Sequence, residues 1–219
     1  MAQGTTDAAH TAKAGVFCRE PAFEGRLPVF FGMSSLNEQK QALRAQVRAR
    51  APKPGSPAFV AASVGAQERL AAAALQSGAR VIALYRALPS ECGTASVAAA
   101  LEAAGREVCY PAVVPGALAL QFRRSAGVFV AGALGVEEPT GGPVSLADID
   151  LLVVPAIAVD AAGRRLGRGR GHYDATLAAY GGPSVALVFD SQLVPEVPVG
   201  EHDRRVGAVC TEARWVSVS

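Results

Sequence analysis

The chain has 219 residues, half of them hydrophobic, so it is long enough to bury a core as one domain or a tightly joined pair of domains. Its longest apolar runs are too short to span a bilayer, and residues 1–33 lack the basic-then-apolar pattern of a secretory signal. The formal net charge of +2 is too small to indicate nucleic-acid binding, and four cysteines without a CxxC pair do not favour disulfides or a zinc site. We expect a cytoplasmic protein with reduced thiols.

The first part of the chain, residues 1–33, is mixed in composition and shows no sustained hydrophobic periodicity. We interpret it as a disordered extension, with Met33 as an alternative start. Directly after it, Ser35 and Glu38 have the spacing of a capping box, in which each residue's side chain accepts a hydrogen bond from the other's backbone N–H. A helix is therefore predicted from here to about Arg50, before the break at 52–57 (PKPGSP).

The rest of the chain alternates between helical and extended patterns around a Gly- and Pro-rich loop at 132–143. The predicted helices are 58–76, 95–105 with Thr94 as its cap, and 175–182. The predicted strands are 79–88, 106–114, 118–124, 148–160, 184–190, 204–212 and 214–219. The continuous Leu, Val and Ile content of 148–160 suits a central strand covered on both faces. The alternation predicts a three-layer α/β/α fold with a mainly parallel, Rossmann-like sheet, formed by one domain over 34–219.

One short segment, Gly163–Gly171 (GRRLGRGRG), concentrates glycine and arginine, and we call it the glycine–arginine loop. It lies between a predicted central strand and the next helix, which is the carboxyl end of the sheet where ligands of such folds bind. Alternating glycines allow several backbone N–H groups to point into one concavity, and arginine guanidinium groups match phosphate oxygens. The loop is therefore a candidate phosphate site.

The loop meets neither of the standard nucleotide-binding patterns. A P-loop needs Gly, four residues and Gly-Lys-Ser/Thr, and the dinucleotide fingerprint needs GxGxxG, whereas this loop has GxGxG and no such lysine. A solvated arginine-rich turn and a patch that binds RNA phosphates are two further interpretations that the loop alone leaves open.

Together with the three residues that follow it, the loop resembles the GxRLGxGxGxYD segment of the 5-formyltetrahydrofolate cyclo-ligases, also called 5,10-methenyltetrahydrofolate synthetases. The resemblance covers roughly residues 35–212, because further landmarks of that family follow one another in the same order. These landmarks are KQALR (40–44), LPSECGT (88–94), YP (110–111), GVEEP (135–139), DLLVVPAIAVD (150–160) and FDSQLVPEVPVGEHD (189–203).

The resemblance implies a reaction. ATP would phosphorylate the formyl oxygen of 5-formyltetrahydrofolate, N10 would attack the activated carbon, and phosphate would leave as the 5,10-methenyl ring closes, giving ADP. Because the formyl oxygen is a poor leaving group, a protein for this reaction mainly has to align the γ-phosphate with that oxygen and spread the developing charge. Arginines, backbone N–H groups and Mg²⁺ suit that task.

The resemblance also implies roles for individual residues. ATP binding falls to Lys40, Arg44, Gly163, Arg164, Arg165, Leu166, Gly167, Arg168, Gly169, Arg170 and Gly171. Catalysis falls to Arg168, Arg170 and Tyr173, folate binding to Glu91, His172 and Tyr173, and Mg²⁺ binding to Asp174 and Asp203.

Each role has a structural alternative. Lys40 and Arg44 are four residues apart on one helical face, a mildly destabilising like-charge pair unless an anion lies between them, and the alternative is two solvated cations. Asp174 could be a helix N-cap and Tyr173 a core aromatic. His172 stands where the family usually has an aromatic residue such as tyrosine.

Residues outside these roles are also candidates for structural positions. We interpret Asp160 as a strand-end acid without a catalytic part and Cys92 as a small buried residue, and Gln192 is a candidate for the pocket wall. Tyr110 and Phe122 are predicted core residues.

The expected partners are small molecules, 5-formyltetrahydrofolate and ATP, with no nucleic acid and no membrane, and the chain is expected to be a monomer. Two rival interpretations differ in class. A non-catalytic relative would bind folate or nucleotide on the same fold, and an RNA-binding module would use the arginines but not Glu91 or Asp203.

Overall fold

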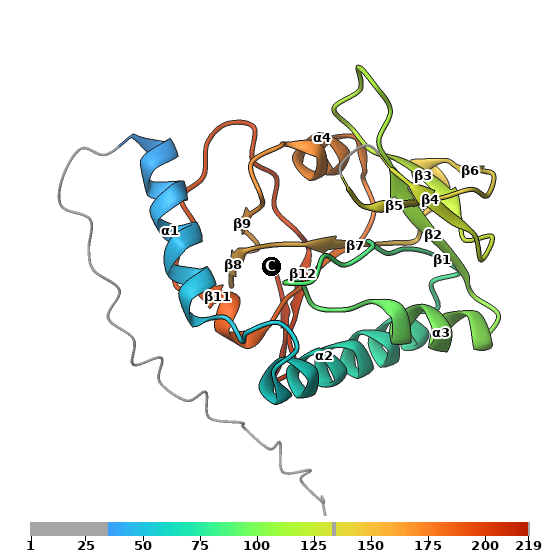
Figure 1. The fold of residues 1–219 in the computed structure, drawn as a ribbon. Helices are drawn as coiled ribbons and strands as arrows, with labels where there is room; N and C mark the ends of the chain where they lie inside the picture. Colours follow the sequence, from blue (N-terminus) through green and yellow to red (C-terminus); the bar gives the residue numbers. More distant parts are fainter. Residues whose placement is uncertain (1–34, 133–134, 219) are drawn as a thin grey trace, which may run out of the picture. The chain divides into compact units, whose positions relative to one another are not determined.

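The computed structural model describes residues 35–132 and 135–218, and a large β-sheet lies at its centre (Figure 1). The strands of this sheet are β1 (Val81–Ala83), β2 (Glu107–Ala112), β3 (Gln121–Arg124), β6 (Pro143–Val144), β7 (Leu151–Pro155), β10 (Ser184–Leu187), β12 (Ala208–Cys210) and β13 (Trp215–Ser217). Among the described residues their order is β13-β12-β10-β7-β1-β2-β3-β6. The run from β12 to β2 is parallel, and β13, β3 and β6 are antiparallel additions at the two edges.

The strand order reverses between β1 and β7. From β1 the chain moves to its neighbour β2 and on to β3 and β6, and then returns to the other side of β1 as β7. From β7 it continues outward through β10 and β12. Ligands of open α/β sheets bind at the carboxyl ends of the strands where the order reverses. The topology therefore points to the ends of β1 and β7.

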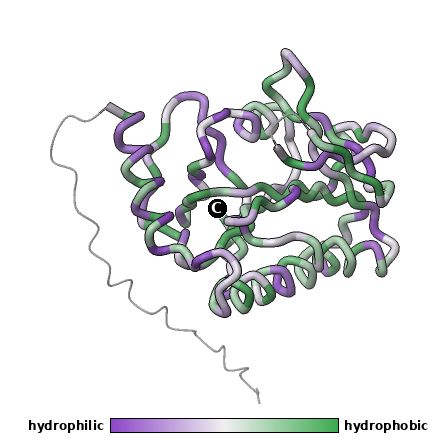
Figure 2. Tube along the Cα trace, viewed as in Figure 1, coloured by the Kyte–Doolittle hydropathy of each residue, from purple (hydrophilic) through white to green (hydrophobic). Residues whose placement is uncertain are grey.

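Helices cover both faces of the sheet. The helices α2 (Pro57–Gln76) and α3 (Ala95–Ala103) pack on one face, and α4 (His172–Ala179) packs on the other (Figure 1). Successive side chains of β7 alternate between them: Val153 joins the core on the α2 and α3 side, and Leu152 and Val154 join the core on the α4 side. Hydrophobic residues accordingly concentrate in the central strands (Figure 2). The predicted three-layer, mainly parallel α/β fold is confirmed.

A smaller sheet extends from the carboxyl end of β7. It contains β8 (Ala158–Asp160), β9 (Arg165–Leu166) and β11 (Leu193–Val194). The helix α1 (Leu36–Arg50) packs on it through Leu43 and Val47, which contact a buried cluster that includes Leu166. This packing holds the cationic start of α1 beside the glycine–arginine loop. The remaining elements are β4 (Phe129–Ala131), β5 (Glu137–Pro139), and the 3₁₀ turns η1 (Leu146–Asp148) and η2 (Asp190–Gln192).

The predicted boundaries hold well for the first helices. The capping box between Ser35 and Glu38 is present, and α1 ends at Arg50 as predicted. The helix α2 begins at Pro57, where Ser56 accepts a hydrogen bond from Phe59 N. The prediction for residues 1–33, including Met33, lies outside the described residues. Within the described part of the chain, no helix is both long enough and apolar enough to cross a membrane.

The prediction of one long strand over 148–160 is wrong, because this segment forms two strands that belong to two different sheets. β7 ends at Pro155 and β8 begins at Ala158. Between them the carbonyl groups of Ala156 and Ile157 accept hydrogen bonds from the side chain of Gln192 instead of a neighbouring strand. A side chain from a distant segment thus ends the sheet, which hydrophobic periodicity does not show.

The other predicted strands are longer than the strands observed. Within 79–88 only Val81–Ala83 is a strand. Beyond it, Tyr85 O accepts a hydrogen bond from Thr94 Oγ1 instead of from a neighbouring strand. Thr94 is therefore at the predicted N-cap position of α3, but its side chain does not cap that helix. The predicted loop at 132–143 contains β5, which pairs with β4, and begins β6.

The helix predicted over 175–182 begins earlier, at His172. Gly171 takes the N-cap position with φ of +76°, a conformation that residues with a side chain rarely adopt. Asp174 therefore lies in the first helical turn and is not the N-cap.

Candidate active site

A cavity of about 820 Å³ opens at the carboxyl ends of β1 and β7, where the strand order reverses. Its size is within the range of about 300–1,000 Å³ that is typical of small-molecule sites. The segments after β1 and β7, the start of α1, the glycine–arginine loop, the start of α4 and the segment 202–204 all contribute to its wall. The predicted site residues that line it are Lys40, Arg44, Glu91, Arg165, Leu166, Gly167, Arg168, Gly169, Arg170, Gly171, His172, Tyr173, Asp174 and Asp203.

Two predicted ATP-binding residues, Gly163 and Arg164, do not line the cavity. Arg164 Nε donates to Asp160 Oδ2 at 2.6 Å, and this hydrogen bond raises the pKa of Arg164. Asp160 is fully buried and also accepts from Arg164 N. A Cβ at Gly163 would lie 2.3 Å from Val206 O, so close approach of the backbone requires glycine there. The beginning of the motif thus stabilises the turn between β8 and β9. This agrees with the interpretation of Asp160 as an acid without a catalytic part.

The acids of the predicted site are paired with its cations. Arg168 Nε donates to Glu91 Oε1 at 3.0 Å, and Arg168 Nη2 donates to Ser90 Oγ at 3.2 Å. Arg165 Nη2 donates to Asp174 Oδ1 at 2.8 Å. The third pair joins the start of α1 to the segment 202–204 through Lys40 and Asp203. A ligand that binds Lys40, Arg165 or Arg168 must therefore replace the carboxylate that each of them contacts.

Asp174 is linked to the segment that carries Asp203. Arg204 N, which follows Asp203 in the chain, donates to Asp174 Oδ1 at 3.2 Å, and Arg165 also pairs with that oxygen. Burial raises the pKa of Asp203, but hydrogen bonds from Gly200 N and Lys40 outweigh burial and hold the pKa below its usual value. The carboxylate of Asp203 is therefore suited to remain ionised at neutral pH.

The arginines of the loop differ in how firmly they are held. The side chain of Arg165 is 2% exposed, and within the described residues its Nε has no hydrogen-bond partner. Arg168 and Arg170 are exposed and line the cavity. For Arg170 no ion pair forms with any residue of 35–132 or 135–218. Arg44 Nε donates to Gly167 O at 3.0 Å and ties α1 to the loop.

The aromatic residues at the start of α4 form another part of the wall. Tyr173 packs against the cores on both faces of the sheet, so its predicted structural alternative and its place in the cavity are both present. Burial, with a smaller contribution from Glu91, raises the pKa of Tyr173, so its phenol stays protonated at neutral pH. His172 Nδ1 contacts Leu118 O at 2.8 Å; because a carbonyl only accepts, Nδ1 carries the proton.

Sequence reasoning missed the apolar part of the wall. It is formed by Val113, Leu118, Leu120, Val136, Pro155, Ala156 and Ile157, and Arg86 also lines the cavity. Some of these residues lie within the landmarks GVEEP and DLLVVPAIAVD, but none was given a role in the site; for those that follow β1, β2 and β7, position at the strand ends is the signal that could have found them. Gln192 is not part of the wall but is buried behind it, so the prediction that it lines the pocket is wrong.

Comparison with known proteins agrees with this arrangement. Residues 36–212 match the 5-formyltetrahydrofolate cyclo-ligase family. The chain is similar to a 5-formyltetrahydrofolate cyclo-ligase of Mycolicibacterium smegmatis, with 34% identity over 65% of this chain and 78% of that protein. It is also similar to the 5-formyltetrahydrofolate cyclo-ligase of Escherichia coli K12, with 31% identity over 62% and 80% of the two chains.

Solved structures share the fold. The 5,10-methenyltetrahydrofolate synthetase of Aquifex aeolicus superposes with a TM-score of 0.67 at 22% identity, over 84% of this chain and 92% of that chain. A 5,10-methenyltetrahydrofolate synthetase from Mycoplasma pneumoniae gives 0.65 at 18% identity, over 79% and 98%. The match over residues 36–212, in which the motifs surround one cavity, establishes that this chain belongs to the 5-formyltetrahydrofolate cyclo-ligase family.

Proposed function

We propose that the protein converts 5-formyltetrahydrofolate to 5,10-methenyltetrahydrofolate in an ATP-dependent reaction that releases ADP and phosphate. Membership of the cyclo-ligase family supports this reaction. The observation that carries it for this chain is that the cations of the loop and of α1 line the same cavity as Glu91 and a set of apolar side chains. Such a cavity has room for an anionic and an aromatic ligand side by side.

The nucleotide phosphates belong on the side of the cavity formed by the loop and α1. Lys40, Arg168 and Arg170 present charged donors there, and Gly167 to Gly171 present backbone N–H groups at the start of α4. Arg170 is the first candidate for a phosphate contact, because it forms no ion pair with the other described residues. The buried Nε of Arg165 is a further donor without a protein partner in residues 35–132 and 135–218.

Asp174 and Asp203 suit a Mg²⁺ ion. The described residues contain no group of three or more His, Cys, Asp or Glu placed to hold a metal. Mg²⁺ does not need such a group, because it commonly takes one or two carboxylates together with phosphate oxygens and water. The carboxylates of Asp174 and Asp203, which line the same cavity beside a loop suited to phosphates, fit this pattern. When bound, Mg²⁺ neutralises negative charge on the phosphate oxygens.

The folate belongs in the part of the cavity near Glu91. One oxygen of this carboxylate accepts from Leu88 N at 2.9 Å, which fixes its orientation, and the other is paired with Arg168. A carboxylate accepts hydrogen bonds only, so it suits the N–H groups of a pterin ring. Tyr173, His172 and the exposed side chain of Leu118 offer surfaces for the rings of the substrate.

Within this arrangement the residues act by alignment and electrostatics. The two ligand sides meet at the ion pair of Arg168 and Glu91, which brings the γ-phosphate close to the formyl oxygen. Transfer of the phosphoryl group makes that oxygen a leaving group as phosphate, and attack by N10 closes the ring. Arg168 and Arg170 spread the negative charge that develops on the transferred group. Tyr173, whose phenol stays protonated, can donate a hydrogen bond at the same place.

The experiment is a spectroscopic assay of purified protein with 5-formyltetrahydrofolate, ATP and Mg²⁺, following the absorbance of the methenyl product. The proposal predicts product that depends on ATP, with no product when ATP is omitted. A folded protein that binds ATP and folate without forming product would instead be a binding relative of the family. The monomeric state and cytoplasmic location stay predictions, and sedimentation analysis tests the first of them.

A further inference from the structure

Gln192, the last residue of η2, uses its whole side-chain amide on buried backbone groups. Its Oε1 accepts from Phe189 N at 2.8 Å. Its Nε2 donates to Ala156 O at 3.0 Å and to Ile157 O at 3.1 Å. The residue is 7% exposed and does not line the cavity, whereas Ala156 and Ile157 do. An amide with two N–H donors and one acceptor oxygen is required to make this set of contacts.

The carbonyls that Gln192 binds lie where β7 leaves the main sheet. A buried backbone carbonyl without a partner destabilises the fold, and neither sheet supplies one between Pro155 and Ala158. The same stretch carries the glycine–arginine loop, because Ile157 N donates to Leu166 O at 2.8 Å and Leu166 immediately precedes Gly167. Ile157 therefore links the Gln192 amide to Leu166 of β9, the strand within the loop.

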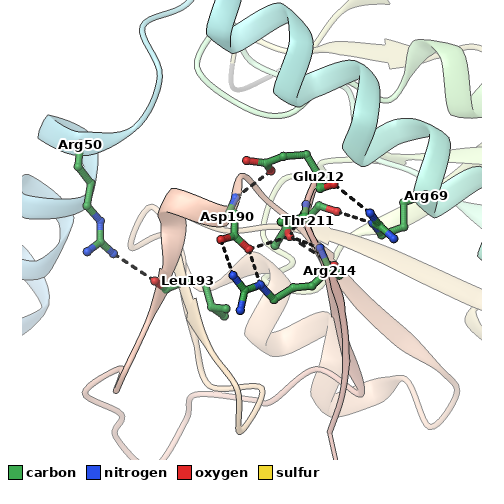
Figure 3. A network of polar contacts seen from close by, with 8 residues as sticks. Arg50, Arg69, Asp190, Leu193, Thr211, Glu212 and Arg214 are labelled. Carbon is green, nitrogen blue, oxygen red and sulfur yellow. Dashed lines mark hydrogen bonds and ion pairs between the residues drawn. The ribbon is translucent and has the colours of Figure 1, made fainter. Parts of the chain in front are cut away.

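A polar network with Arg69 of α2 and residues 211–214 holds the turn η2 in place (Figure 3). Arg214 donates to both carboxylate oxygens of Asp190, at 2.8 and 3.0 Å, and Asp190 N donates to Glu212 Oε2 at 2.9 Å. Arg69 of α2 donates to Thr211 O and Glu212 O, both at 3.0 Å. A two-point contact between arginine and carboxylate restricts orientation as well as distance. The network thus holds η2 against α2 and the turn between β12 and β13.

We propose that Gln192 is a positioning residue for the nucleotide site. It fixes the peptide groups of Ala156 and Ile157, and through Leu166 it sets the conformation of the glycine–arginine loop, without touching a ligand. The two hydrogen bonds from Arg214 to Asp190, which we call the clamp on Asp190, keep Gln192 in place. The identity of the ligand as ATP rests on the proposed function, whereas the control of the loop conformation does not.

The test compares Gln192→Met with Tyr180→Phe. Methionine has a similar size and removes all three hydrogen bonds. Tyr180 is buried, does not line the cavity, and its hydroxyl contacts the carbonyls of Ile149 and Pro183 near the opposite end of β7, at 3.0 and 3.1 Å. Both variants therefore lose buried hydrogen bonds to backbone carbonyls near an end of β7, but only Gln192→Met loses bonds beside the loop.

Two readouts separate positioning from general stability. Hydrogen exchange of the amides in 166–171 should become faster in Gln192→Met and stay unchanged in Tyr180→Phe. This difference should remain when the two variants have lost the same amount of thermal stability. The dissociation constant for ATP, measured by calorimetry, should rise by about 10-fold in Gln192→Met only, because small misplacements in a site have effects of up to about 100-fold. Asp190→Asn, which weakens the clamp at a partly exposed position, should change both readouts less and in the same direction.

Unchanged loop exchange and ATP affinity in Gln192→Met, or equal changes in Tyr180→Phe, would overturn the proposal. If Gln192→Met does not fold, Asp190→Asn decides on the same two readouts. A wild-type protein that binds ATP but forms no methenyl product would defeat the proposed function and leave both readouts for Gln192 intact. A wild-type protein that does not bind ATP would also defeat the proposed function, and loop exchange alone would then decide on Gln192.

Discussion

The arginines of the glycine–arginine loop lie in different environments: Arg164 is held within the fold, Arg168 and Arg170 are exposed in the cavity, and Arg165 is buried but also lines the cavity. In the first half, 163–166, Arg164 is paired with the fully buried Asp160 and lies outside the cavity. In the second half, 167–171, Arg168 and Arg170 are exposed in the cavity wall. The difference arises because the first half pairs with β8, whereas the chain leaves the sheet after Leu166. An arginine in this motif thus serves the fold or the ligand according to what surrounds it.

The largest expected effect is a loss of folding stability when the ion pair that holds the first half of the loop is removed. Asp160→Ala leaves the guanidinium of Arg164 without its buried partner and also removes the acceptor for Ala162 N and Val197 N. Loss of one member of a buried ion pair costs about 3–5 kcal/mol, so the free energy of unfolding in denaturant titration should fall by about that amount. Asp148→Ala, at an exposed acid of η1, is the control and should change it by less than about 0.5 kcal/mol. Equal stability of the two variants would contradict this account.

The next effect is on the second half. Arg168→Ala removes a charge-assisted donor from the phosphate side, and such a bond contributes about 1.5–3 kcal/mol. The value of kcat/KM for ATP should therefore fall by about 10- to 100-fold. Thermal unfolding should change little, because the side chain is 41% exposed and its ion pair with Glu91 lies near solvent. Unchanged ATP kinetics would remove Arg168 from the site.

A smaller effect concerns the link between α1 and the segment 202–204. The lowered folded-state pKa of Asp203 means that its ionised form stabilises the folded protein. That stabilisation is fully present above the unfolded value of about 3.9 and is lost as pH falls through the lower folded pKa. Asp203→Asn should therefore be less stable than wild type at pH 7, by at most about 1 kcal/mol. In urea titrations across pH the difference between the two proteins should begin to shrink below about pH 4 and vanish below the folded pKa of Asp203, and a constant difference would contradict this cause.

The smallest effect tests whether the internal acid competes with the ligand. Glu91→Gln removes the charge that holds Arg168, so ATP alone should bind up to about 5-fold more tightly, as an ion pair near the surface contributes at most about 1 kcal/mol. Glu107→Gln, which removes the partner of Arg124 outside the cavity and changes the net charge equally, should leave ATP affinity unchanged. Calorimetry of ATP without folate measures both. Weaker binding to Glu91→Gln would refute the competition.

Sequence patterns predict the parts of this protein that depend on local chemistry. The capping box of α1 and the α/β layering follow from local patterns, whereas the grouping of Lys40, Glu91 and the loop in one site was implied by the resemblance to the cyclo-ligase family. Ion-pair partners do not follow, because Asp203 meets Lys40 across the fold. The break between β7 and β8 depends in the same way on the distant Gln192. The apolar cavity wall was missed because its residues resemble ordinary core positions.

The most direct test of the contrast within the loop is to measure thermal unfolding and the KM for ATP side by side in Arg164→Ala and Arg170→Ala. The account predicts a lower unfolding temperature with an unchanged KM for Arg164→Ala, because Asp160 then stays buried without its partner. It predicts an unchanged unfolding temperature with a KM raised by about 10-fold or more for Arg170→Ala, which loses a charged donor to phosphate. The opposite pattern, or a KM raised equally in both variants, would contradict it.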